Sequence, residues 1–239
     1  AAELVALAGA VGTDAGGDGG GGDRGGDSAD AQGVLAVVDE ESELTYLGVA
    51  PHRPAGETAH DLPEGVPATV LSDRVLVPDP PAVLHDRAFY GQRLDRDAAA
   101  LQLSLVEAAA LADRGVLVVE GGPDGLVERG RAVEGDRFDR RLRVYETLRA
   151  AGVVPKTGFK FGADFRTYRD VDDVDSLGHS DLLVRVLPRD HVFDPRDVAL
   201  DVRLAHGVRK RLVVALVGAG DGASGPTAID WLGVERLTP

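Results

Sequence analysis

The amino-acid sequence predicts an α+β fold: a small α+β domain followed by a larger domain with a mixed central sheet, and part of an earlier domain in front. Segments with the apolar spacing of helices alternate with short apolar runs that are typical of strands. A pattern of helix end, apolar strand, turn and aromatic-containing strand occurs twice, at 4–49 and at 202–234. With 239 residues, 44% of them apolar, the chain can bury a core.

The front of the chain, residues 1–50, is predicted to be the C-terminal remnant of a first repeat. Residues 12–33 are Gly/Asp-rich and of low complexity, so we expect a disordered insert there. GVLAVV at 33–38 and LTYLGV at 44–49 predict a β-hairpin with an acidic tip. The acids of this tip are Asp39, Glu40, Glu41 and Glu43. Methionine is absent even from position 1, which predicts that the front of the protein is missing from this sequence.

A linker and a first complete domain are expected next. Residues 51–70 contain four prolines among polar residues and predict the linker. The domain is expected over 71–134, where VLVP at 75–78 predicts a short strand. DAAALQLSLVEAAALAD at 97–113 predicts a helix, because its leucines and alanines recur on one helical face. Gly115 would end that helix, and the apolar run VLVVE after it predicts a second strand.

The last domain is expected over 135–239. A helix is predicted at 136–150, and strands are predicted at 158–169 and 182–187. Asp194-Pro195 predicts the start of another helix, since aspartate caps helix N-termini and proline suits the first helical position. The apolar runs RLVVALV and TAIDWLGV predict the two final strands.

The charge balance is strongly acidic. Asp and Glu number 40 against 26 Lys and Arg, for a net charge of −14, and Lys156, Lys160 and Lys210 are the only lysines. Such a composition is typical of proteins that stay soluble in strong salt, as in a haloarchaeon, although GC-rich codon usage would also favour it. No apolar run approaches the ~20 residues that span a bilayer, so we expect a cytoplasmic protein without a membrane partner. The absence of cysteine excludes disulfides and thiolate metal sites.

Several ordered motifs resemble one known family. GVVPKTGFKFGADFRTYRD, GHSDLLVRVLP and DVRLAHGVRKRLVVALV, between 152 and 217, are similar to the catalytic domain of archaeal tRNA-splicing endonucleases of the two-repeat, homodimeric type. FYGQRL and LQLSLVEAAALADRG resemble the small N-terminal domain of that family. The resemblance covers roughly 71–239 and part of the first repeat. It implies a nuclease-type α/β catalytic domain that acts on RNA without a metal or another cofactor.

The resemblance also implies the catalytic residues. The family cleaves RNA with a tyrosine, a histidine and a lysine, which match Tyr168 in FRTYRD, His179 in GHSDLL and Lys210 in VRKRL. Imidazole titrates near pH ~6.5, which suits an acid for the leaving oxygen, and a lysine can stabilise the charged phosphorane. A phenol ordinarily titrates near pH ~10, so a tyrosine base needs neighbouring cations. Taken singly, each of the three could be an ordinary packing, turn or surface residue.

Further residues are implied to bind RNA or the partner subunit. The family holds a bulged base between two arginines, which match Arg203 and, less closely, Arg236. Counting back from Lys210 by seven also places Arg203 on the same face of a continuous helix. The acidic tip at 39–43 matches an acidic loop that enters a basic groove of the opposite subunit, although an ordinary exposed turn is the alternative. Four basic residues and no acid lie between 203 and 211, which gives an acidic protein a local site for RNA.

The function implied is excision of introns from precursor tRNA at bulge-helix-bulge motifs, with 2′,3′-cyclic phosphate and 5′-hydroxyl ends. A non-catalytic structural subunit of the same enzyme is one alternative. The other is a metal-dependent nuclease, since Asp164, Asp170, Asp172, Asp173 and Asp175 lie close together in the sequence. We expect those aspartates to form a solvated acidic loop, because the whole protein is rich in aspartate.

Overall fold

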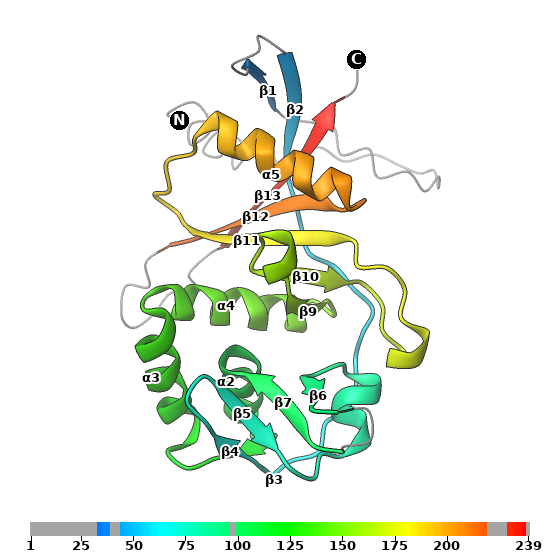
Figure 1. The fold of residues 1–239 in the computed structure, drawn as a ribbon, viewed down its shortest axis with the longest axis vertical. Helices are drawn as coiled ribbons and strands as arrows, with labels where there is room; N and C mark the ends of the chain where they lie inside the picture. Colours follow the sequence, from blue (N-terminus) through cyan, green and yellow to red (C-terminus); the bar gives the residue numbers. More distant parts are fainter. Residues whose placement is uncertain (1–32, 39–43, 96–98, 219–228, 238–239) are drawn as a thin grey trace, which may run out of the picture. The chain divides into compact units, whose positions relative to one another are not determined.

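The computed structural model describes residues 33–38, 44–95, 99–218 and 229–237. The chain divides into two compact units. The first unit comprises 1–53, 159–163 and 182–239, and the second comprises 54–158 and 164–181. Helices and strands occur in both units, which confirms the α+β class (Figure 1). The Gly/Asp-rich insert up to residue 32 and the acidic tip at 39–43 lie outside the described residues.

The first unit is built on a mixed sheet. Its strands are β1 (Gly33–Val38), β2 (Leu44–Pro51), β11 (Leu182–Pro188), β12 (Arg211–Val217) and β13 (Ile229–Leu237). They follow the order β1-β2-β13-β12-β11, in which β11 and β12 are parallel and the other neighbours are antiparallel. The hairpin β1–β2 and the hairpin β12–β13 are therefore joined through β2 and β13. The two copies of the sequence repeat lie edge to edge in one sheet.

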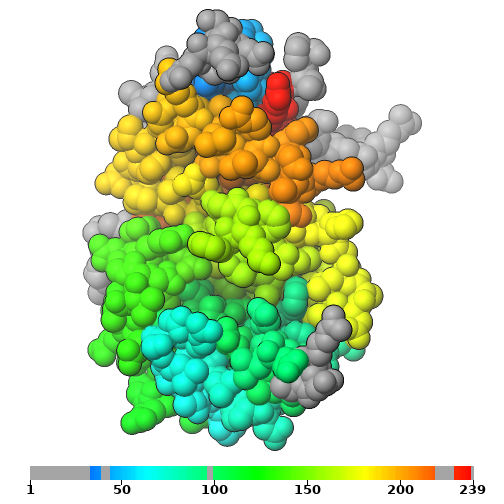
Figure 2. Space-filling model, viewed as in Figure 1, coloured from blue at the N-terminus to red at the C-terminus, as the bar shows by residue number. Residues whose placement is uncertain are grey.

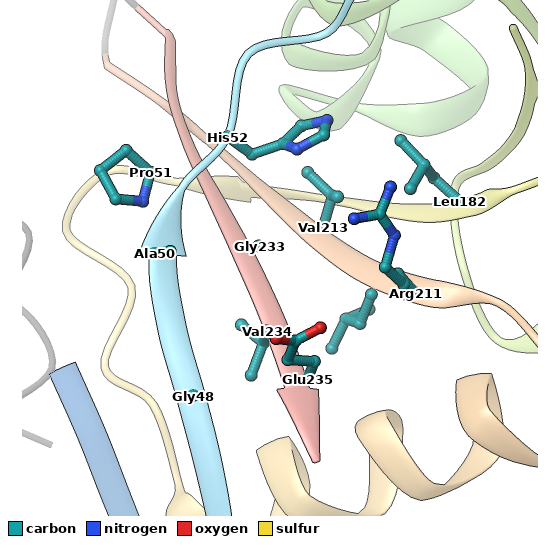
Figure 3. A pocket seen from close by; sticks show the side chains of 11 residues that line it. Gly48, Ala50, Pro51, His52, Leu182, Arg211, Val213, Gly233, Val234 and Glu235 are labelled. Atoms are coloured by element: carbon teal, nitrogen blue, oxygen red, sulfur yellow. The ribbon is translucent and has the colours of Figure 1, made fainter. Parts of the chain in front are cut away.

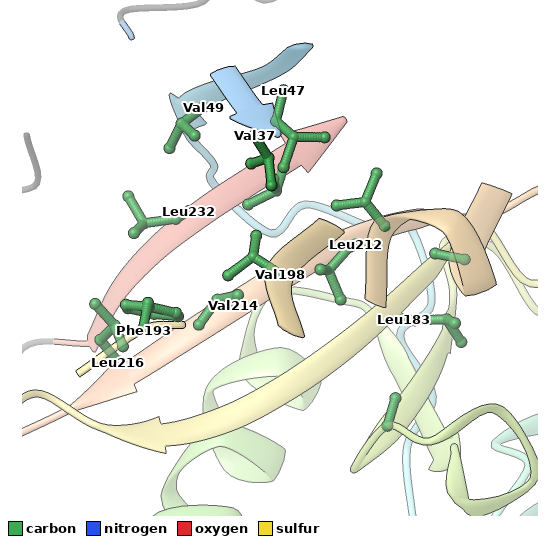
Figure 4. Close-up of a cluster of buried hydrophobic side chains, with 14 residues drawn as sticks. Val37, Leu47, Val49, Leu183, Phe193, Val198, Leu212, Val214, Leu216 and Leu232 are labelled. Atoms are coloured by element: carbon green, nitrogen blue, oxygen red, sulfur yellow. The ribbon is translucent and has the colours of Figure 1, made fainter. Parts of the chain in front are cut away.

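One helix, α5 (Pro195–Gly207), covers a face of this sheet. Asp194 begins it as predicted, because its carboxylate accepts a hydrogen bond of 2.8 Å from the backbone N–H of Arg196. Val198, Val202 and Ala205 of α5 pack into a core with Leu47, Leu212, Val214 and Leu232 of the sheet (Figure 4). The opposite side of α5, drawn in orange, is exposed in the space-filling view (Figure 2).

The second unit combines three helices with short strands. Its helices are α2 (Leu105–Asp113), α3 (Gly122–Glu134) and α4 (Arg137–Ala150), with a π-helical turn η1 (Val83–Arg87). Its strands are β3 (Val66–Pro67), β4 (Thr69–Val70), β5 (Arg74–Val77), β6 (Gln92–Arg93), β7 (Leu101–Ser104), β8 (Leu117–Val118), β9 (Val154–Thr157) and β10 (Phe165–Tyr168). The strands β4-β5-β7-β6 form an antiparallel sheet, and β9 and β10 form an antiparallel hairpin. Among the described residues, no helix of either unit has the length and hydropathy needed to cross a membrane.

The helix predicted at 97–113 is shorter than expected. It begins only at Leu105, because Ser104 and Glu107 form a capping box in which each side chain bonds the backbone N–H of the other residue. The preceding segment, Leu101–Ser104, is strand β7, whose alternate residues are buried and which pairs with β5. Leucine and glutamine favour a helix by propensity, but pairing with the neighbouring strand overrides that preference.

Two other predictions also need correction. Helix α3 was not predicted, because its sequence GPDGLVERGRAVE has few apolar residues and three glycines. One of them, Gly130, is required by packing, since a Cβ atom there would lie 2.2 Å from the buried ring of Phe138. The strand predicted at 158–169 is limited to β10 at Phe165–Tyr168, because the first part of that range is the short 3₁₀ turn η2 (Phe159–Phe161), followed by Gly162 with φ of +69°. Strand β9 lies before the predicted range, at Val154–Thr157.

The predicted linker at 51–70 contains a hydrogen-bonded segment. The backbone N–H groups of Gly56, Glu57 and Thr58 donate to the carbonyl oxygens of Ala151, Arg169 and Gly152 at 2.8–3.0 Å. The chains approach so closely that a Cβ atom on Gly56 would lie 2.3 Å from the oxygen of Gly152. Within the second unit, this segment therefore holds the chain that leaves β10 at Arg169.

Candidate active site

Tyr168 is the last residue of β10 and is buried. Its ring packs in a small cluster with Phe89, Val154 and Val171. The ring of Phe89 meets it in an edge-to-face arrangement, with centroids 5.5 Å apart and an interplanar angle of 67°. The guanidinium carbon of Arg166 lies 5.6 Å from the centroid of the Tyr168 ring.

His179 lies on an exposed loop of the same unit. It lines a pocket with Arg169 and several acids, which are Asp170, Asp172, Asp173 and Asp181. Val171 and Leu177 line this pocket as well, and both pack in the cluster around Tyr168. The backbone N–H of Asp181 donates to the oxygen of Thr167 at 3.0 Å, which ties the end of the loop to β10. The second unit therefore brings Tyr168 and His179 into one region.

The aspartates between 164 and 175 do not behave alike. Asp170, Asp172 and Asp175 are exposed, as a solvated loop requires. Asp164 is buried, and its carboxylate lies 2.6 Å from Arg137 and 3.3 Å from Arg141, so the prediction of a solvated residue is wrong there. Within the described ranges, no three His, Asp or Glu side chains are arranged to hold a metal ion.

Lys210 lies in the turn between α5 and β12 of the first unit. Its backbone N–H donates to Ala205 at 2.9 Å, and that of Arg209 donates to His206 at 2.9 Å. These two bonds form a Schellman motif, in which Arg209 takes the left-handed position with φ of +57°. Glycine is usual at this position, so the backbone at Arg209 is strained. The turn directs the chain at Lys210 away from the helix. The Lys210 Nζ lies 5.8 Å from the centroid of the Phe161 ring.

This turn corrects the expected relation between Arg203 and Lys210. The helix ends at Gly207, so counting by seven along a continuous helix does not place the two residues on one face. Arg203 is exposed on α5, and Arg236 is exposed on β13, where it pairs with Leu47. Lys210, Arg203 and Arg236 belong to the first unit, whereas Tyr168 and His179 belong to the second.

Sequence analysis did not find a buried ion pair in the second unit. The Lys156 Nζ lies 3.0 Å from Glu107 Oε1, and both side chains are buried. Burial alone would raise the pKa of Glu107, but the charge of Lys156 and hydrogen bonds from the N–H groups of Ser104 and Gly91 outweigh it and lower the pKa from 4.5 to about 2. The scarcity of lysine in this sequence was the available signal, because one of only three lysines is buried here.

A groove of the second unit is lined by several basic residues. Arg74, His85, Arg141 and Arg166 line it together with the Glu107–Lys156 pair. Arg74 pairs with Asp73 at 2.8 Å, and Arg141 pairs with Glu134 at 2.5 Å. The Nε of Arg166 is buried and has no hydrogen-bond partner in the part of the chain that the structure describes.

A second hollow lies on the sheet of the first unit, on strands β2, β12 and β13. It is lined mainly by backbone and small residues, with His52, Arg211 and Glu235 as its polar side chains (Figure 3). None of the predicted site residues lines it.

An α+β chain with a buried tyrosine, an exposed histidine and an arginine-rich helix end has the side chains that a metal-independent ribonuclease would use. Comparison with known proteins gives the family. The profile of the tRNA intron endonuclease N-terminal domain matches residues 66–129. The profile of the tRNA intron endonuclease catalytic C-terminal domain matches residues 138–224. The chain therefore belongs to the tRNA intron endonuclease family.

Three relatives agree with this assignment. The chain is 61% identical over 209 residues to a tRNA-splicing endonuclease of Haloarcula marismortui, and this match covers 86% of the chain and 59% of the relative. It is 62% identical to the protein of the same name from Natronomonas pharaonis, covering 86% of the chain and 60% of the relative. The match to the tRNA-splicing endonuclease of Methanosarcina mazei is 42% identical over 80% of the chain and 56% of the relative. The chain thus spans somewhat more than half the length of these relatives.

Proposed function

We propose that the protein is an endoribonuclease that excises introns from precursor tRNA at bulge-helix-bulge motifs. The observation that carries this proposal is that Tyr168, His179 and Lys210 occur together in the matched catalytic domain, each in its motif context. A non-catalytic subunit of the same family would not need to retain all three residue types. The proposed products carry 2′,3′-cyclic phosphate and 5′-hydroxyl ends.

In the proposed reaction, the ribose 2′-oxygen attacks the adjacent phosphorus. Tyr168 accepts the proton of the 2′-hydroxyl, and the guanidinium of Arg166 lies near its ring. His179, exposed at the surface, donates a proton to the departing 5′-oxygen as its bond to phosphorus breaks. Lys210 places its positive charge beside the phosphorane, which carries more negative charge than the substrate or the product phosphate. No step requires a metal ion or another cofactor.

A cleavage assay tests this proposal. The purified protein is incubated in high salt with a synthetic bulge-helix-bulge RNA, with a fully paired RNA as control, and with or without EDTA. We expect cleavage of the bulged RNA alone, at equal rates with and without EDTA, with cyclic phosphate at the 3′ end of the upstream product. Loss of cleavage in EDTA would indicate a metal-dependent nuclease, and absence of cleavage in both conditions would indicate a structural subunit.

We further propose that two copies of the chain form a homodimer through the acidic tip at 39–43. Strand β1 ends just before these residues and strand β2 begins just after them. The groove of the second unit described above is the proposed receptor on the partner subunit, because Arg74, Arg141 and Arg166 line it. Carboxylates pair favourably with guanidinium groups in such surroundings.

Charge reversal at the tip is expected to abolish this dimer. The triple variant Asp39→Lys, Glu40→Lys and Glu43→Lys would place like charges opposite each other, and like charges across an interface are strongly unfavourable. We expect the mass from light scattering after size exclusion to fall from dimer to monomer. Reversal of three exposed acids outside the tip, Asp61, Glu64 and Asp79, changes the net charge equally and should leave the mass unchanged. A dimeric triple variant with full activity would contradict the role of the tip.

We also propose that Arg203 binds an unpaired base of the substrate. Its side chain is exposed on the outer side of α5, close in sequence to Arg209 and Arg211. A guanidinium plane can stack on a base and still bond phosphate, which an ammonium group does less well. Arg236, exposed on β13 of the same unit, is the proposed second arginine.

Substitutions of Arg203 should separate stacking from charge. Arg203→Ala and Arg203→Lys are both expected to weaken binding of bulged RNA by ~1–3 kcal/mol, and a fully paired RNA should be affected less. Affinity is measured by titration at fixed salt, with Arg129→Ala on α3 as a matched loss of one exposed arginine. Full rescue by lysine, or equal losses on the two RNAs, would show that Arg203 is a plain phosphate contact.

A further inference from the structure

The buried pair Glu107–Lys156 is bonded to one short stretch of backbone. The Lys156 Nζ donates to the carbonyl oxygens of Phe89 at 3.2 Å and of Gly91 at 2.7 Å. Glu107 Oε1 accepts a hydrogen bond of 3.0 Å from the backbone N–H of Gly91. Besides the capping-box bonds between Glu107 and Ser104, both charged groups therefore bond residues 89–91, which lie between η1 and β6.

That stretch has an unusual conformation. Phe89 has φ of +53° and Gly91 has φ of +63°. A left-handed conformation is ordinary for glycine but costly for a bulky aromatic residue, so it persists only where the surroundings determine it. The carbonyl oxygen of the preceding residue, Ala88, also accepts a hydrogen bond of 2.8 Å from the partly buried Arg149. These cation–carbonyl bonds, together with the backbone hydrogen bonds of Phe89 to His85 and of Tyr90 to Leu84, hold the strained backbone at Phe89.

The ring of Phe89 connects this backbone to the candidate active site. The Phe89 ring lies edge-to-face against the Tyr168 ring. The Lys156 Nζ lies 4.7 Å from the centroid of the same Phe89 ring. The cluster around Tyr168 contains only three other buried residues, two of which are valines. Phe89 is therefore the one aromatic neighbour in that cluster that fixes the plane of the Tyr168 ring.

We propose that Glu107 and Lys156 are positioning residues for RNA cleavage: they hold Phe89 in its left-handed conformation, and the Phe89 ring holds the phenol of Tyr168 in its reactive orientation. This inference rests on the proposed role of Tyr168 as the base. A buried ion pair is seldom more stabilising than apolar residues of similar volume. Convergence of its hydrogen bonds on a strained segment beside a catalytic candidate gives this pair a role beyond stability.

The principal test removes both charges together. In Glu107→Gln/Lys156→Met no charge is left buried without a partner, so the variant is designed to fold. We expect its single-turnover cleavage rate on bulge-helix-bulge RNA to fall by about tenfold to a hundredfold, because small displacements of a reacting group are costly. The RNA dissociation constant should stay within twofold of wild type. Wild-type cleavage by this variant would overturn the proposal.

Substitutions at Phe89 test the proposed route. Phe89→Leu removes the aromatic edge and should lower the rate as the double variant does, whereas Phe89→Tyr keeps the ring and should retain most of the rate. Leu126→Ala creates a cavity at a buried position of α3 in the same unit and serves as the control for lost stability. The folded Leu126→Ala variant should cleave RNA at the wild-type rate. A normal rate for Phe89→Leu beside a slow double variant would show that the pair does not act through Phe89.

A spectroscopic measurement separates this inference from the proposed function. The protein is labelled with 3-fluorotyrosine, and the ¹⁹F resonance of Tyr168 is assigned by its loss in Tyr168→Phe. We expect this resonance to shift or broaden in Glu107→Gln/Lys156→Met and in Phe89→Leu, but not in Leu126→Ala. An unchanged resonance in the double variant would refute positioning even if cleavage were lost. If the wild-type protein did not cleave RNA, the proposed function would be wrong. The Tyr168 resonance would still show whether Glu107 and Lys156 control the packing of Phe89 against Tyr168.

Discussion

Replacement of His179 by alanine is expected to lower the cleavage rate by about 10²-fold or more while leaving RNA affinity nearly unchanged. His179 lies on an exposed loop at the pocket next to the Tyr168 cluster, and no other histidine lines that pocket. Without a proton donor, the departing 5′-oxygen must leave as an alkoxide, which raises the barrier of bond cleavage. The measurement is single-turnover cleavage of a bulge-helix-bulge RNA with enzyme in excess.

A second histidine provides the control for this experiment. His191 lies in the first unit, where its ring meets Phe193 at a centroid distance of 4.9 Å. His191→Ala removes an imidazole without touching the proposed catalytic residues, so its cleavage rate should stay close to that of the wild type. A His179→Ala enzyme with full activity would exclude His179 as the general acid, and a loss confined to RNA affinity would make it a binding residue.

Removal of Lys156 alone is expected to lower the free energy of unfolding by about 3–5 kcal/mol. Lys156→Met leaves the carboxylate of Glu107 buried without its cation, and the carbonyl oxygens of Phe89 and Gly91 lose their donor. The measurement is denaturant unfolding at pH 7. As a control, Arg131→Met breaks the exposed ion pair with Asp139 and should change the stability little, because water screens such pairs. Equal effects of the two substitutions would contradict the argument.

The pH dependence of this effect has a defined sign. In the wild type the pKa of Glu107 is lowered from 4.5 to about 2, so its contribution to stability is present above pH 4.5 and is lost as the pH falls towards 2. In Lys156→Met, burial without the cation raises the pKa of Glu107 instead. The variant should therefore recover stability relative to wild type as the pH is lowered from 7 towards 4.5. Unfolding midpoints at several pH values test this, and a constant difference would refute it.

The sequence by itself determined the features that depend on local chemistry. Asp194 and Pro195 define the start of α5 because capping and a preset φ act within one turn of the chain. The strand-like runs GVLAVV and LTYLGV predicted the hairpin β1–β2, and the motifs around Tyr168, His179 and Lys210 predicted the family. The assignment of catalytic and RNA-binding roles stays a prediction until the variants are measured.

Tertiary structure decided the features that depend on contacts between distant residues. Leu101–Ser104 is a strand because β5, about 27 residues earlier, pairs with it, and Gly130 is tolerated in α3 because Phe138 occupies the space beside it. The turn at Arg209 separates Lys210 from the face of α5, which helical spacing could not foresee. Glu107 and Lys156 are 49 residues apart in the chain, and only folding brings them into a hydrogen-bonded ion pair. Lys156 of this pair also donates to the carbonyl oxygen of Phe89. A buried charge acquires its partner from the packing of different elements, and no local pattern in the sequence encodes that partner.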